Sequence, residues 1–98
     1  MEFMAQYIVV SWKGIPTVVE AQDGGDTATV QLSEKFQALV DSVAMMQGLA
    51  DSEAYLEAWE RSAPAERPGT AGEVAAAVAE DFEDRFMEFA QRAFVTKA

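Results

Sequence analysis

The spacing of apolar side chains changes once along the chain and divides it into two parts. Between residues 5 and 32, apolar and β-branched residues form short runs bounded by glycine, proline and aspartate, a pattern typical of β-strands. From residue 33 onward, apolar residues recur at intervals of three and four, which is typical of helices. The sequence therefore predicts a βββααα order.

The first part predicts a meander of antiparallel strands. The runs over about 5–12 and 15–21 are separated by a turn containing Gly14, and Asp23-Gly-Gly-Asp26 supplies a second turn. Residues 27–32 then alternate between apolar and polar side chains, as expected for a half-exposed strand. We expect a small three-stranded sheet over about residues 5–32.

The second part predicts helices over about 33–48, 51–62 and 71–95. Ser33 is a suitable N-cap for the first, and Gly48 is placed to end it. The third begins with Thr70-Ala-Gly-Glu73, the pattern of a capping box. With the three helices packed on one face of the sheet, the chain is predicted to form a single α+β domain over residues 1–98.

The composition excludes several common kinds of catalytic and metal-binding site. The 98 residues contain no cysteine and no histidine, so thiol chemistry, zinc–thiolate sites and the usual general base near neutral pH are excluded. We expect no catalytic residue, no metal site and no cofactor. A hydrolase that uses a pair of carboxylates stays open, so whether the protein is an enzyme is left uncertain.

Charge and hydropathy narrow the class of partner. The formal net charge of −10 disfavours binding to nucleic acids and to anionic membranes. The N-terminus lacks a basic segment followed by an apolar core, and no apolar run reaches the roughly 20 residues of a membrane span. We therefore expect a soluble cytoplasmic protein.

The acidic run from Glu80 to Asp84 has two interpretations. On a helix its carboxylates share a face, which could hold a weakly bound divalent cation or contact a basic partner. The simpler interpretation is a solvated helix face, because two carboxylate pairs without a shaped loop do not define a metal site.

The chain carries more large apolar side chains than its predicted core needs. The tryptophan beside the hairpin turn could lie in the core or anchor a partner, and the C-terminal helix is apolar around too wide an arc for one buried stripe. The methionines at 45 and 46 are more typical of core filling. Our candidate interaction residues are Trp12, Lys13, Ile15, Pro16, Tyr55, Trp59, Phe86, Phe89 and Phe94.

Three blocks of the chain resemble a small bacterial family known as virulence factor. They are Ile8–Val19 with its Trp-Lys-Gly-Ile-Pro turn, Leu32–Met46 with its Leu-Ser-Glu-Lys-Phe start, and Asp51–Trp59 with its Tyr-Leu-Glu-Ala-Trp end. The likeness covers about residues 7–60, and the last third matches only in general helical character. The resemblance implies no catalytic residues. It does imply that proteins of this family are found near folate- and corrinoid-dependent one-carbon enzymes in some bacteria.

Three functions remain after these exclusions. We expect a non-catalytic interaction module, an accessory subunit or regulator of a larger cytoplasmic enzyme, with a protein partner or a second copy bound. The first alternative is a ligand-binding or enzymatic domain whose pocket lies between sheet and helices and is lined by Trp12, Tyr55 and Trp59. The second alternative is a stand-alone structural homodimer.

Overall fold

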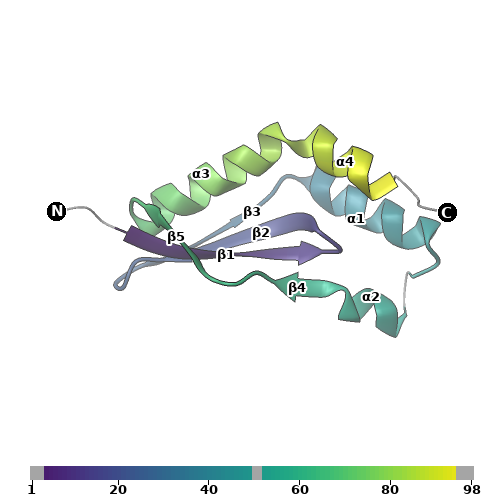
Figure 1. Ribbon diagram of the computed structural model, residues 1–98, viewed down its shortest axis with the longest axis horizontal. Coiled ribbons are helices and arrows are strands. Elements are labelled where there is room, and N and C mark those ends of the chain that lie inside the picture. Colours follow the sequence, from purple (N-terminus) through teal and green to yellow (C-terminus); the bar gives the residue numbers. More distant parts are fainter. Residues whose placement is uncertain (1–3, 50–51, 95–98) are drawn as a thin grey trace.

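A computed structural model describes residues 4–49 and 52–94, with the side chain of Phe94 outside the described part. It is an α+β structure in which helices pack on a five-stranded antiparallel sheet (Figure 1). The strands are β1 (Met4–Trp12), β2 (Ile15–Gln22), β3 (Thr27–Gln31), β4 (Trp59–Arg61) and β5 (Ala65–Pro68). The helices are α1 (Glu34–Met46), α2 (Glu53–Glu57), α3 (Ala71–Asp84) and α4 (Phe86–Phe94).

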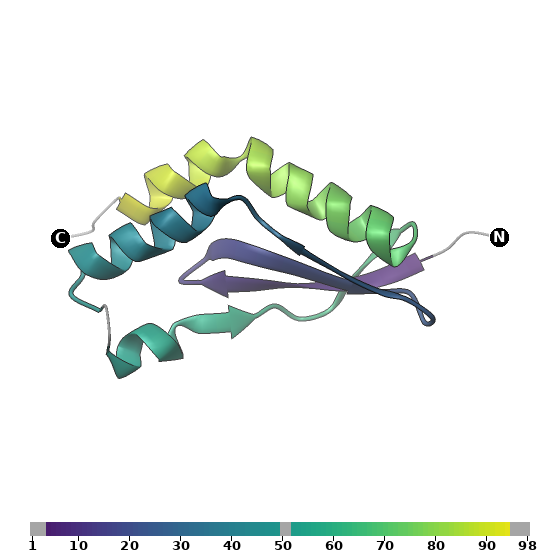
Figure 2. The same cartoon turned by 180° about the vertical axis from the view of Figure 1, so that it is seen from behind.

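The long strand β1 organises the sheet, whose order is β3-β2-β1-β4. One side of β1 pairs with β2 along most of its length, and its other side is shared by β5 near the start and β4 near the end. Helices α3 and α4 follow one another along one side of the sheet, and α2 lies beyond β4 (Figures 1 and 2). No helix in the described residues is long and apolar enough to cross a membrane.

A two-residue turn joins β1 to β2, as predicted. Lys13 and Gly14 both have positive φ, 48° and 84°, which matches the twist of a tight hairpin. Trp12 pairs with Ile15 on either side of this turn, and the register shifts between Val10 and Ser11. The turn therefore fixes the position of Trp12 at the end of the sheet.

The prediction of a three-stranded sheet was wrong in the number of strands, because the sheet has five. Two short strands from the second half of the chain pair with β1 and were assigned by pattern to a helix and a loop. β4 has three residues and β5 four, too few to show an apolar period, and β5 ends in a proline. The free edge of β1 induces both strands, and this long-range pairing is not visible in local sequence.

Two helix predictions also need correction. The helix expected over 51–62 is the short α2, because the chain becomes extended at Trp59 to pair with β1. The long helix expected over 71–95 breaks at Arg85 into α3 and α4. The break involves neither proline nor glycine. It turns α4 toward α1, where Phe86 and Phe89 pack around Phe36 with ring centroids 5.1 and 6.1 Å from it.

Carboxylates from other elements hold the N-termini of two helices. The Oδ2 of Asp23, in the β2–β3 turn, accepts a 2.8 Å hydrogen bond from the amide of Ala71 at the start of α3. Glu83 of α3 accepts hydrogen bonds from the amide and hydroxyl of Ser33, at 2.7 and 2.8 Å, just before α1. The predicted capping box of Thr70 and Glu73 is confirmed. Ser33 occupies the predicted N-cap position, but its hydroxyl bonds Glu83 instead of capping α1.

Candidate functional site

Trp12 lies in the core and not on the surface. Its side chain has no exposed area, and its indole Nε1 donates a 2.9 Å hydrogen bond to the carbonyl of Tyr55 in α2. A buried indole with its one donor satisfied is a structural anchor. Trp12 therefore points into the interior.

The three aromatic residues singled out in the sequence do come together. The ring centroids of Trp12 and Tyr55 are 5.4 Å apart, and those of Tyr55 and Trp59 are 6.2 Å apart in an edge-to-face arrangement. Trp12 and Trp59 also pair directly across β1 and β4. This aromatic cluster fastens α2 to the end of the sheet. Within the cluster only Tyr55 and Trp59 keep partial exposure.

Among the other candidates from the hairpin turn, only Lys13 is exposed. Ile15 is 3% exposed and Pro16 is also buried, so both contribute to the interior. The Lys13 amide donates to the carbonyl of Ala58, and its Nζ donates a 2.9 Å hydrogen bond to Gln47 beyond the end of α1. Lys13 thus joins the turn to α1 and to the end of α2.

A hollow of about 690 Å³ opens beside this cluster, between α1 and α2. We call it the α1–α2 groove. Its apolar walls include Met45 and Leu56, whose side chains are 72% and 67% exposed, and the adjacent Met46 is 49% exposed. The groove is lined by Asp41, Ala44, Met45, Ser52, Glu53, Tyr55 and Leu56.

Sequence reasoning missed this groove. Met45 and Met46 were expected to fill the core, but α1 buries Val43 and Ala44 on the sheet side and leaves both methionines outside. No local signal in the sequence marked the groove, because it depends on α2 ending at Glu57, where the sequence predicted a longer helix. Tyr55 takes the inner face and Leu56 the outer one.

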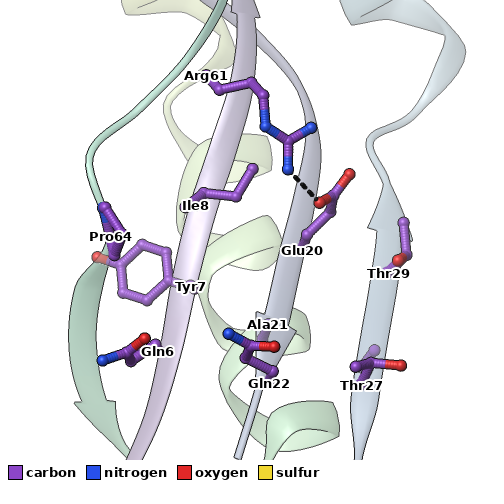
Figure 3. A pocket seen from close by; sticks show the side chains of 11 residues that line it. Gln6, Tyr7, Ile8, Glu20, Ala21, Gln22, Thr27, Thr29, Arg61 and Pro64 are labelled. Carbon is purple, nitrogen blue, oxygen red and sulfur yellow. Dashed lines mark hydrogen bonds and ion pairs between the residues drawn. The ribbon is translucent and has the colours of Figure 1, made fainter.

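The open face of the sheet has a different character. A shallow hollow of about 220 Å³ there is lined mainly by polar side chains, with Tyr7 beside Pro64 (Figure 3). Arg61 of β4 and Glu20 of β2 form an exposed ion pair of 2.8 Å across β1 (Figure 3). A third hollow, lined by Trp59 and Phe36, lies between the sheet and the start of α1. Tyr55 and Trp59 therefore line separate hollows.

Phe86 and Phe89 of α4 face mainly inward. Phe89 is 8% exposed, and Phe86 is partly buried against Phe36. Arg85 and Arg92 stand over the ring of Phe89, at 5.2 and 5.7 Å from its centroid. The break at Arg85 thus accounts for part of the wide apolar arc. Phe94 ends α4, but its side chain lies outside the described residues.

The acidic run on α3 serves the structure at two positions. Burial raises the pKa of Glu83, but hydrogen bonds from Ser33 and the charge of Lys35 outweigh this and lower it overall. Asp81 forms a 3.1 Å ion pair with Arg67 of β5. Within residues 4–49 and 52–94, no group of three or more acidic side chains is arranged to hold a metal ion.

Comparison with known proteins identifies the family. The model of the Virulence factor family matches residues 10–94, and the chain belongs to this family. The match extends the three-block resemblance through the C-terminal helices. No curated protein and no solved structure matches the chain.

Proposed function

We propose that this member of the Virulence factor family is a non-catalytic interaction module, an accessory subunit or regulator of a larger cytoplasmic enzyme. The observation that carries the proposal is the α1–α2 groove, where Met45 and Leu56 remain about 70% exposed beside a filled core. Exposed apolar side chains gathered along a groove are a common mark of a protein-binding surface.

The shape and charge of the groove favour one kind of occupant. Flexible methionine side chains adapt to an inserted apolar residue, as in other grooves that bind helical segments. Asp41 and Glu53 line the same groove, and the whole chain carries a net charge of −10. We infer that the groove receives an amphipathic segment of the partner, with an apolar anchor and flanking lysine or arginine residues.

The burial of the aromatic cluster supports this choice of surface. Trp12, Ile15 and Pro16 contribute to the core, so the contact surface we propose uses Lys13, Tyr55 and the exposed side chains of α1 and α2. Their role in partner binding stays a prediction. The family resemblance makes folate- and corrinoid-dependent one-carbon enzymes the first partners to examine.

Matched variants test the proposal. Met45→Ser with Leu56→Ser removes the apolar walls of the groove, and Met87→Ser removes an equally exposed methionine from α4. Both proteins and the wild type would be purified from cells at native expression level, with stoichiometric companions identified by mass spectrometry. We expect one enzyme subunit to accompany the wild type and Met87→Ser, and to be lost from the double variant. A companion retained equally by all three proteins would overturn the proposal.

A synthetic peptide supplies the second arm of the test. The peptide would be the amphipathic segment of that companion that we expect to enter the α1–α2 groove. It would be titrated against the wild type at low and high salt. We expect binding that weakens as salt rises, because the flanking charges contribute, but that persists through the apolar anchor. Binding that is unaffected by the double substitution would place the contact elsewhere.

A further inference from the structure

The two edges of the sheet are protected very differently. On one side, β4 and β5 are only three and four residues long, and both include charged side chains. Pro64 and Pro68 also lie along that side. Short strands, charges and prolines are the usual means of preventing another strand from pairing. On the other side, β3 has the sequence Thr-Ala-Thr-Val-Gln, with neither charge nor proline.

The outer side of β3 offers a regular row of backbone groups. The amide of Leu32 bonds the carbonyl of Thr17 in the register of β2 with β3, so Ala28 and Val30 also direct their backbone groups toward β2. The alternate residues Thr27, Thr29 and Gln31 then direct theirs outward. Among the described residues, no backbone hydrogen bond outside the regular strand pairing uses these groups. β3 is the outermost strand on the side opposite β5 (Figure 3).

We propose that β3 pairs with β3 of a second copy, so that the two sheets join into one. In an antiparallel pair centred on Thr29, each Thr29 faces its own counterpart and Thr27 faces Gln31. These polar pairs lie on the open face, where all three side chains are exposed. On the other face Ala28 of one copy meets Val30 of the other, and both residues are only partly buried in the single chain. Such cross-strand pairs stabilise antiparallel sheets.

Within β3 this register brings no two charged side chains together, because the strand contains none, which matters for two chains that each carry −10. Just beyond the strand, Asp26 comes opposite Leu32. The outward groups of three residues from each copy give about six backbone hydrogen bonds. A contact of five residues per strand is smaller than a standard stable interface. The dimer should therefore be weak, and salt should strengthen it by screening the net charge.

This surface is distinct from the α1–α2 groove, and the two proposals can fail independently. Sedimentation equilibrium of the intact chain over a range of concentrations at low and high salt measures the association. Thr29→Lys places two like charges opposite each other at the centre of the pair and should weaken association about tenfold or more. Gln22→Lys adds the same charge to the exposed face of β2 and should leave association unchanged.

A cysteine at the centre of the pair provides a second readout. The natural chain has no cysteine, and Thr29→Cys would bring two thiols to a pair with Cα atoms about 5.5 Å apart, within reach of a disulfide. We expect a disulfide-linked dimer with Thr29→Cys and not with Gln22→Cys. A wild type that stays monomeric at every concentration and salt would overturn the proposal, and would leave the β3 edge to a strand of another protein. Association that survives Thr29→Lys, or that the groove double substitution abolishes, would also overturn it.

Discussion

The two faces of α2 show what distinguishes core from surface at this end of the molecule. On the inner face, Tyr55 packs against Trp12 and accepts the indole hydrogen bond through its carbonyl. On the outer face, Leu56 is 67% exposed and lines a groove with Met45. The inner contacts are made of large rings with satisfied polar atoms. The outer ones are flexible aliphatic side chains without a partner in the described chain.

The difference indicates that burial, more than residue type, separates folding from binding here. Tryptophan is the residue most expected at a binding hot spot, yet Trp12 is fully buried. Leu56 and Met45 of the groove are less typical of hot spots than tryptophan, but they are large apolar side chains that remain accessible. The following changes test this division between the two faces, from the largest effect on stability to the smallest.

Replacing Trp12 should have the largest effect. Trp12→Ala leaves a cavity where α2 meets the sheet and removes the indole hydrogen bond to the Tyr55 carbonyl, and should lower the free energy of unfolding by about 3–5 kcal/mol. Chemical denaturation measures the change. Trp12→Phe retains a ring and loses mainly the hydrogen bond, at a cost of about 1–3 kcal/mol. A Trp12→Ala protein as stable as the wild type would show that the aromatic cluster is not part of the core.

An intermediate effect is expected from Glu83, which holds the N-terminus of the helix that carries Met45. The folded-state pKa of Glu83 is lowered, so its stabilising contribution is present at neutral pH and is lost as the pH falls below about 4. Glu83→Gln should therefore be less stable than the wild type at pH 7, and the difference should shrink as the pH falls from 7 to 3. Denaturation curves at both pH values measure it.

Asp23 provides a parallel test at the other helix. Hydrogen bonds from the amides of Ala71, Asp26 and Gly25 lower its pKa, with that of Ala71 contributing most. Asp23→Asn should therefore also be less stable than the wild type at pH 7, with a difference that shrinks as the pH falls. A deficit that stays constant between pH 7 and pH 3, in either variant, would show that the carboxylate charge is not what holds the helix.

The smallest effect on stability is expected in the groove. Met45→Ser with Leu56→Ser changes side chains that are mostly exposed, so the free energy of unfolding should change by no more than about 0.5 kcal/mol per site. Thermal and chemical denaturation measure it beside Met87→Ser. A loss comparable with that of Trp12→Ala would mean that Met45 and Leu56 are core residues, and the division between the faces of α2 would fail.

The sequence predicted the elements that depend on local pattern and failed where distant strands decide. The β1–β2 hairpin, β3, α1 and the capping box at Thr70 follow from periodicity and turn residues within about ten positions of each other. β4 and β5 exist because β1 has a free side, and Trp59 becomes extended because it pairs with Trp12. The break at Arg85 depends on the packing of Phe86 and Phe89 against Phe36, a contact that links opposite halves of the chain.

The candidate site, too, could be predicted from the sequence only in part. Sequence alone singled out Trp12, Tyr55 and Trp59, and the structure does bring them together. Which of their neighbours stays exposed could not be predicted, because it depends on how much of α2 remains helical after β4 forms. Leu56 and Met45 become groove residues only through that arrangement.

The most direct test of the interaction module is site-specific photocrosslinking in cells at native expression level. A photoreactive amino acid at position 56 would report on the α1–α2 groove, and the same group at position 87 would report on an exposed site of α4. We predict one discrete adduct with a different protein from position 56 and none with that protein from position 87. No adduct at position 56, or the same adducts from both positions, would contradict the account.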